Sequence, residues 1–213
     1  MNGTYHQIRF PYDPARAKVW RAISCYLQPH VSERERLLDL GAGYGEFTRF
    51  VRAAEKWALD ANAELKAYWA PEVRPLIQSA LSPFPLESSS VGTVFASNFF
   101  EHFTVDECCR ILMEVRRVLR PGARLIAVQP NFRLEPFRYF DDYTHKTPFT
   151  NAGFRDLLVS MGFRISREEP RFLPFSMSSR LPKWGWLVGA YLALPYRPLA
   201  GQFLVVAERP EGV

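Results

Sequence analysis

Residues 37–47 read LLDLGAGYGEF, and this stretch decides the fold of the chain. A short apolar run carries one acid, Asp39, and is followed by three alternating glycines and the start of a helical pattern. This order predicts a strand that passes through a tight turn into a helix N-terminus, where an α/β sheet holds a nucleotide-like cofactor. Glycine at these positions lets the backbone approach a ligand that a Cβ atom would obstruct.

The spacing of the glycines distinguishes between cofactors. Dinucleotide folds usually carry G-x-G-x-x-G, with the pyrophosphate at the helix N-terminus. This chain has G-x-G-x-G, and Glu46 stands where the third glycine of that pattern would fall. Its carboxylate would repel a pyrophosphate but suits a cofactor with an ammonium and a sulfonium group. Asp60 closes the next apolar run and is placed to accept hydrogen bonds from a ribose diol in either class of enzyme.

With Asp39 two positions before the first glycine, this stretch resembles motif I of the class I S-adenosylmethionine-dependent methyltransferases. Further motifs extend the resemblance over about residues 12–169 and 202–208: VFASN at 94–98, Glu101-His102, and EVRRVLRPG at 114–122. The resemblance implies S-adenosylmethionine as the cofactor. The cofactor contacts that it implies are Asp39, Gly41, Ala42, Gly43, Gly45, Asp60, Ser79, Ala80 and Asn98.

The chain departs from that family at two positions. Ser79 stands where an acid often meets the adenine amino group, and a hydroxyl accepts such a hydrogen bond more weakly than a carboxylate. Gly92 replaces an acid that often starts the fourth strand. We expect the first change to weaken cofactor affinity and the second to be structural.

The family resemblance and the alternation of strand and helix patterns predict one fold. It is an α/β fold of the Rossmann-like, doubly wound type, with a mostly parallel seven-stranded sheet and an antiparallel last strand. The expected strands are 36–40, 56–60, about 75–78, 93–97, 124–129, 163–168 and 202–208. The expected helices are 13–27, one opened by a capping box at Thr104–Glu107, and one that begins at Thr150 and stops at Gly162. A further helix is expected after the glycine turn, with an apolar face that continues from Phe47 to Ala54.

Size and composition place limits on the function. At 213 residues and 47% hydrophobic content, we expect a single methyltransferase domain over residues 1–213. The net charge of +5 comes from scattered basic residues, so no nucleic-acid partner is expected. The three cysteines suggest neither disulfides nor a Cys-x-x-Cys metal site. Because Asn98 replaces a cleft acid of the catechol type, no metal is predicted, and the absence of a leader or spanning segment favours the cytoplasm.

Two segments lie outside the plain fold, and one of them carries the candidate catalytic residues. In the expected substrate-side loop 130–149, His145 is the first choice as general base because its pKa range suits proton transfer. Asp142 or Asp141 is expected to orient its ring. The alternative is that Asp142 and Thr144 only bond local backbone in a self-contained loop. His102 is interpreted as a packed, hydrogen-bonded histidine and Glu101 as a cap of the following segment.

The second segment, 170–201, is an aromatic and proline-rich insertion. The stretch 142–150 resembles that of bacterial small-molecule methyltransferases, some associated with polysaccharide or lipid-linked glycan synthesis. A hydroxyl of a sugar or lipid-linked glycan precursor is therefore the expected acceptor, since aromatic rings stack on sugar faces. Residues 180–196 are candidates for a peripheral membrane contact or a homodimer contact. A nicotinamide-dependent oxidoreductase and a non-catalytic S-adenosylmethionine-binding partner protein stay open as alternatives.

Overall fold

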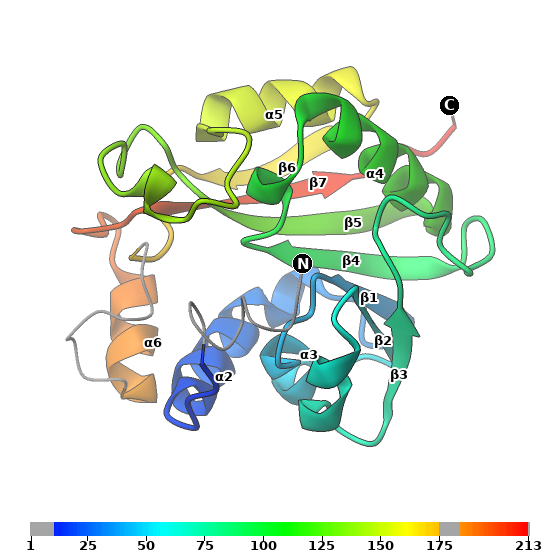
Figure 1. Cartoon of the computed structure of the whole chain (residues 1–213), viewed down its shortest axis with the longest axis horizontal. Helices are drawn as coiled ribbons and strands as arrows, with labels where there is room; N and C mark the ends of the chain where they lie inside the picture. Colours follow the sequence, from blue (N-terminus) through cyan, green and yellow to red (C-terminus); the bar gives the residue numbers. More distant parts are fainter. Residues whose placement is uncertain (1–10, 175–183, 213) are drawn as a thin grey trace.

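The computed structural model describes residues 11–174 and 184–212, and a seven-stranded sheet runs through them (Figure 1). Residues 1–10 of the N-terminus and 175–183 of the insertion lie outside the described residues. The sheet has the order β3-β2-β1-β4-β5-β7-β6. Its strands are β1 (Arg36–Leu40), β2 (Glu55–Asp60), β3 (Val73–Ile77), β4 (Val91–Ser97), β5 (Leu119–Pro130), β6 (Arg164–Glu169) and β7 (Gln202–Glu208).

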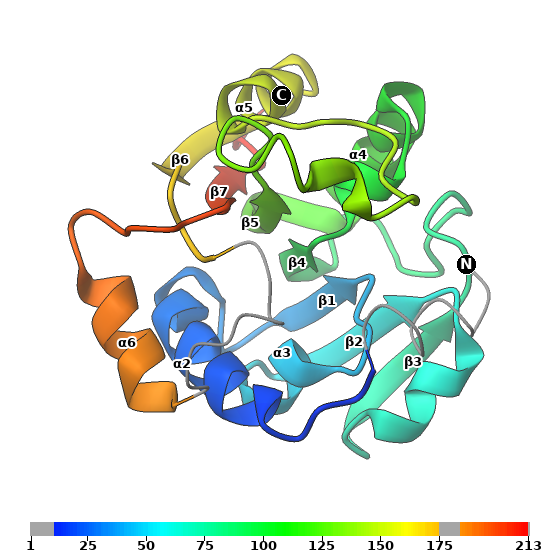
Figure 2. The same ribbon diagram turned by 60° about the vertical axis from the view of Figure 1, so that its left-hand side comes forward.

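The direction of the strands confirms the predicted fold. Strands β1 to β5 pair in parallel, whereas β7 runs antiparallel to both β5 and β6. Chain order reverses between β1 and β4, which lie side by side at the middle of the sheet (Figure 2). A doubly wound sheet opens a crevice beyond the carboxyl ends of its strands at such a point. The glycine turn follows β1 there.

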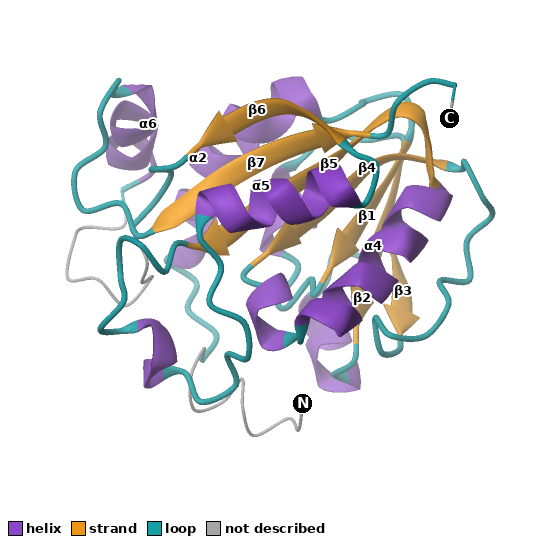
Figure 3. Cartoon of the chain, turned by 90° about the horizontal axis from the view of Figure 1, so that it is seen from above, coloured by secondary structure: helices purple, strands orange, loops and turns teal. Residues whose placement is uncertain are grey.

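Helices cover both faces of the sheet. Figure 1 shows α4 and α5 on one side of the strands and α2, α3 and α6 on the other, and Figure 3 shows α4 and α5 lying across the sheet. Each layer buries its own apolar cluster, one centred on Ile111 and Phe154 and the other on Ile23 and Leu192. The bounds are α2 (Arg16–Leu27), α3 (Glu46–Phe50), α4 (Val105–Val118), α5 (Asn151–Ser160) and α6 (Gly185–Ala193).

Local signals in the sequence account for several helix ends. The Thr104 hydroxyl accepts from the Glu107 backbone at 3.3 Å while the Glu107 carboxylate accepts from the Thr104 backbone at 2.8 Å, so the predicted capping box is present. Thr150 caps α5 in the same way, through a hydrogen bond from Gly153. Gly162 ends that helix with a left-handed φ of 81°. These ends depend only on neighbours within one turn.

Several elements differ from the sequence prediction. Helix α3 is a single turn that ends at Phe50, because Val51 is already extended; the apolar face predicted to continue to Ala54 is wrong. Strand β5 begins at Leu119, directly after α4, and not at residue 124. The insertion 170–201 contains α6, which packs beside α2 on the sheet (Figures 1 and 2). Throughout the described part of the chain, every helix is too short or too polar to span a bilayer.

Candidate active site

The three motif glycines adopt left-handed backbone conformations, with φ of 65° at Gly41, 54° at Gly43 and 72° at Gly45. A Cβ atom at Gly41 would lie 2.5 Å from the Phe99 ring, and one at Gly45 would lie 2.7 Å from the Trp69 ring. A Cβ at Gly43 would meet no atom of the described residues within 4 Å. Gly41 and Gly45 are therefore required for packing, whereas no described atom would contact a Cβ at Gly43.

Hydrogen bonds hold the Gly43 peptide from both sides. Its N–H donates to Asp60 Oδ2 at 3.0 Å, and its carbonyl accepts from the Trp69 indole at 2.7 Å. The other Asp60 oxygen accepts from the Asn62 backbone at 2.9 Å. Asp60, the expected ribose ligand, thus lies against the glycine turn with its carboxylate already fixed in direction. A carboxylate has about four acceptor positions, so both oxygens can still accept from a diol.

Acidic side chains surround this turn. Asp39 is only 3% exposed, and burial raises its pKa well above the ordinary value, with the charges of Glu46 and Asp60 adding to the effect. Burial also raises the pKa of Glu46, although the Arg16 guanidinium, 3.1 Å away, opposes the rise. The repulsion that we expected from Glu46 toward a pyrophosphate is reduced by this ion pair. The combined acidic character still favours a cationic ligand group.

The remaining predicted cofactor residues flank the turn. Ala42 is buried within it, and Ser79 and Ala80 follow the carboxyl end of β3. The Ser79 hydroxyl accepts from the Leu81 backbone at 3.2 Å. Asn98 directly follows β4 with a left-handed φ of 48°, and its side-chain oxygen accepts from Gln202 at 2.6 Å. The structure therefore places all these residues at the carboxyl edge of the sheet, on strands β1 to β4.

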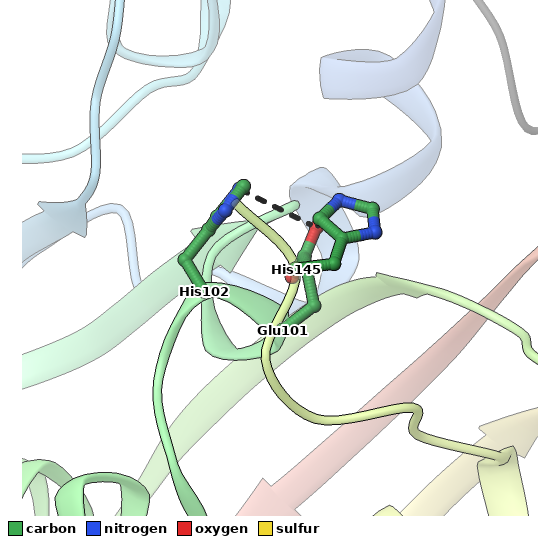
Figure 4. Close-up of side chains that lie close together, drawn as sticks. All are labelled: Glu101, His102 and His145. Carbon is green, nitrogen blue, oxygen red and sulfur yellow. Dashed lines mark ion pairs between the residues drawn. The ribbon is translucent and has the colours of Figure 1, made fainter. Parts of the chain in front are cut away.

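A second cluster follows β4 at the same edge. Glu101 and His102 lie in the short helix η3 (Phe100–His102), and His145 comes from the loop after η4 (Tyr139–Asp141). Glu101 Oε1 is 3.9 Å from His102 Nε2 and 4.0 Å from His145 Nε2 (Figure 4). The loop is anchored here because the Glu101 carbonyl accepts from the backbones of Lys146 at 2.7 Å and Thr147 at 3.2 Å.

Asp142 reaches a histidine of this cluster through Thr144. The Thr144 hydroxyl donates to Asp142 Oδ1 at 2.6 Å and lies 2.9 Å from His102 Nδ1. Sequence reasoning paired Asp142 with the His145 ring, whereas these contacts direct its carboxylate toward His102. The local-backbone alternative also holds in part, since the Thr144 backbone donates to the same Asp142 oxygen at 3.0 Å.

The electrostatics of the cluster follow from its burial. Burial raises the pKa of the Glu101 carboxyl well above its usual range, with Asp142 adding to the rise. Burial, followed by the charge of His145, lowers the pKa of His102 to about 4, so this ring is neutral at neutral pH. The interpretation of Glu101 as a helix cap is wrong, because Thr104 and Glu107 cap α4 and the Glu101 side chain is fully buried.

The sequence did not reveal the roles of three residues that shape the site. Phe99 packs on Gly41, Trp69 holds the Gly43 carbonyl, and Thr144 links Asp142 to His102. None of the three belongs to a chemical motif. The run of aromatic residues around Phe99 is the one sequence signal for that residue. The roles of Trp69 and Thr144 depend on contacts with distant parts of the chain.

Residues 38–127, which run from β1 through the glycine turn and Glu101 to β5, match the family model described as a methyltransferase domain. The predicted resemblance to class I S-adenosylmethionine-dependent methyltransferases is confirmed over this part of the chain.

Curated relatives of the methyltransferase domain carry several different names. The chain is 32% identical over 160 residues to malonyl-[acyl-carrier protein] O-methyltransferase of Methylococcus capsulatus, a match that covers 65% of this chain and 55% of that protein. It is 27% identical over 164 residues to ubiquinone/menaquinone biosynthesis C-methyltransferase UbiE of Burkholderia vietnamiensis, covering 68% and 66%. The match therefore spans only about half to two thirds of the length of these relatives.

Solved structures agree on the fold. A SAM-dependent methyltransferase from Archaeoglobus fulgidus superposes with a TM-score of 0.68 at 17% identity, over 90% of this chain and 94% of that one. The domain implies S-adenosylmethionine as its cofactor. The residues fit this molecule, because Gly43 leaves space for close approach and the acids around the turn match its positively charged groups.

Proposed function

We propose that this protein transfers a methyl group from S-adenosylmethionine to a hydroxyl of a small-molecule acceptor. The observation that carries the proposal is the glycine turn at Gly43, where a Cβ would meet no described atom within 4 Å, together with the buried Asp39 and the fixed Asp60. Bound there, the cofactor supplies a methyl group on a sulfonium, which is transferred by an in-line displacement. Orientation of the reactants alone contributes roughly 7–11 kcal/mol to such a reaction.

The residues of the chain divide this task between them. Asp60 would hold the ribose hydroxyls, the acids around the turn would hold the ammonium, and the backbone near Gly43 would lie along the cofactor. Ser79 and Ala80 would border the adenine, and Asn98 would lie beside the reacting end. These assignments are supported by position, since all of these residues lie at the carboxyl edge of β1 to β4.

The acceptor would bind on the side of loop 130–149. We expect His145 to accept the proton of its hydroxyl, because the ring lies beyond β5 at the same edge as the turn. Asp142 and Thr144 would support the cluster through His102. A lost general base typically lowers the rate 10²–10⁴-fold.

A sugar or lipid-linked glycan hydroxyl is the acceptor that this surface favours. Aromatic side chains are exposed in the loop, where Phe137 is 95% exposed and Phe140 and Tyr143 also face solvent. Aromatic rings present an apolar face on which a sugar ring can stack. Trp184 and Trp186 extend the exposed aromatic surface at α6, where their rings stack at 5.8 Å.

A direct binding experiment tests the first step. Calorimetry of the full chain with S-adenosylmethionine and NAD side by side should show binding of the former only. The acceptor is then tested by S-adenosylhomocysteine release with nucleotide sugars, polyprenyl-linked sugars, malonyl thioesters and quinone precursors. Release with a glycan substrate alone supports the proposal; release with a malonyl or quinone substrate contradicts the acceptor class. Binding without release from any acceptor would favour the non-catalytic partner protein.

The last part of the proposal is a membrane contact through residues 180–196. Residues 180–183 of this segment lie outside the described range. Exposed Trp184, Trp186 and Tyr196 form the apolar surface that would lie on a bilayer. Co-sedimentation with anionic liposomes should fall when Trp184 and Trp186 are replaced by serine. Equal sedimentation of both proteins contradicts the contact, and a loss of dimer in the variant at sedimentation equilibrium would assign this surface to a second copy of the chain.

A further inference from the structure

The cluster of Glu101, His102 and His145 brings three ligand atoms toward one point. One ligand atom from each residue lies within 4.8 Å of the other two, and both Nε2 atoms approach the same carboxylate oxygen, Glu101 Oε1 (Figure 4). At 3.9 and 4.0 Å these pairs are too far apart for hydrogen bonds, which end near 3.2 Å. The three groups thus surround a space instead of sharing a proton directly.

The proton on His102 is positioned away from this space. The Thr144 hydroxyl has a single proton, which it donates to Asp142 Oδ1 at 2.6 Å. Its oxygen must then accept at 2.9 Å from His102 Nδ1, which carries the ring proton. His102 Nε2, the unprotonated ring nitrogen in this arrangement, lies 3.9 Å from Glu101 Oε1. A carboxylate or hydroxyl behind a histidine ring is the usual second partner of a metal-binding imidazole.

Glu101 shows the need for a positive partner. Its side chain is fully buried, and no hydrogen bond of ordinary geometry reaches either carboxylate oxygen from the described residues. The nearby N–H groups of Phe99 and Glu101 itself compensate its charge only in part. A buried carboxylate is costly unless it is paired or coordinates a metal. The neutral His102 ring supplies no charge to balance it.

We propose that Glu101, His102 and His145 bind a divalent transition-metal ion, with Zn²⁺ as the best match. Two imidazole nitrogens and one carboxylate oxygen are the donor set of many three-ligand zinc sites and of related iron sites. Mg²⁺ and Ca²⁺ prefer oxygen ligands alone. Zinc bonds of about 2.0–2.1 Å in a tetrahedron place the ligand atoms roughly 3.4 Å apart. The two Glu101–histidine pairs would close by about half an ångström from 3.9 and 4.0 Å, and every pair of ligand atoms in the cluster starts within 4.8 Å.

The consequence for the acceptor rests on the proposed function. Three protein ligands leave a coordination position open, and the cluster lies at the same sheet edge as Gly43 and Asn98. An acceptor hydroxyl bound at that position would keep its oxygen on the ion while its O–H bond breaks and the proton passes to water. His145 would then hold the ion and act on the acceptor proton through it, instead of removing the proton itself.

Metal titration of the full chain tests this proposal without cofactor or acceptor. Protein freed of metal by a chelator is titrated with Zn²⁺ by calorimetry and with Co²⁺ by visible absorption. We expect about one equivalent of either ion and a tetrahedral or five-coordinate Co²⁺ spectrum. Glu101→Gln and His145→Ala should weaken the affinity by at least about 100-fold, and Thr144→Val by about 10–100-fold because only the orientation of His102 is lost. His30→Ala, a histidine on another part of the surface, is the matched control.

The outcomes separate this proposal from the proposed function. Wild-type protein that binds neither ion, or binds them with the same affinity in Glu101→Gln, overturns the metal site. Equal weakening in His30→Ala would also do so, because it indicates adsorption to exposed histidines. Calorimetry with S-adenosylmethionine is run on the same Glu101→Gln protein. Metal binding without cofactor binding would overturn only the proposed methyl transfer, and cofactor binding without metal binding would overturn only the metal site.

Discussion

Replacing Gly43 by alanine separates the binding role of the glycine turn from its structural role. The backbone at Gly43 has a φ of 54°, and a left-handed conformation costs a residue with a Cβ about 1–2 kcal/mol. The added methyl group meets no described atom within 4 Å, so no packing cost adds to this strain. In a chain of this size, the loss corresponds to a melting temperature lower by about 2–8 °C.

The effect on cofactor affinity has a different origin. The new methyl group would occupy the space that the cofactor needs in order to approach the protein backbone at residue 43. Inserting a methyl group into a packed contact costs about 1–3 kcal/mol. At about 1.4 kcal/mol for each factor of ten, the dissociation constant for S-adenosylmethionine should rise roughly 5- to 150-fold. The hydrogen bonds from the Gly43 peptide to Asp60 and Trp69 involve backbone atoms and are retained.

Calorimetry and thermal melts of the same Gly43→Ala preparation measure both effects. Gly162→Ala is the matched control, because its φ is 81° and its new Cβ would lie 3.3 Å from the flexible Arg116 side chain, far from the turn. We expect a similar loss of stability in the control with unchanged affinity. Unchanged affinity in Gly43→Ala, in a folded protein, would refute the placement of the cofactor at this turn.

Three further predictions follow from single side chains. His145→Ala should lower turnover at least about 10²-fold while S-adenosylmethionine binding persists by calorimetry; an unchanged rate would remove His145 from the reaction. Because the pKa of buried Asp39 is raised, its stabilising contribution is complete below 3.8 and is lost as the pH rises through the raised value. Melts of cofactor-free Asp39→Asn against pH should lack that loss, and curves parallel to wild type would contradict the burial argument. Arg197→Met should lower the unfolding free energy by about 1.5–3 kcal/mol, because Glu169 loses one charged hydrogen-bond partner while Arg167 and Tyr26 still contact it. Burial raises the pKa of Glu169, but hydrogen bonds from Arg197 and Tyr26 outweigh burial, so the net pKa is lowered. The stabilisation from the Arg197–Glu169 pair is therefore lost as the pH falls below 4.5 and through the lowered pKa. Urea titrations at several pH values measure both the loss of stability and its pH dependence.

The turn and the helix caps were predictable because each depends on residues close together in the chain. The glycines after β1, the Thr104–Glu107 capping box and the Gly162 stop all lie where local rules place them. The strand order was predictable only through the family resemblance. The length of α3 was not predictable from the sequence. This one-turn helix ends before Val51, which packs into the core, although the apolar pattern of the sequence continues beyond that residue.

The sequence alone established that an acid-flanked glycine turn follows the first strand of a doubly wound sheet, since strand, turn and helix signals act over a few residues. Packing in the folded chain determines which of the three glycines no described atom crowds, because the rings that close on Gly41 and Gly45 come from Phe99 and Trp69. It also decided that His145 meets Glu101 and His102. Contacts between segments so distant in the chain leave no local pattern, because they form only when the sheet brings its strand ends together.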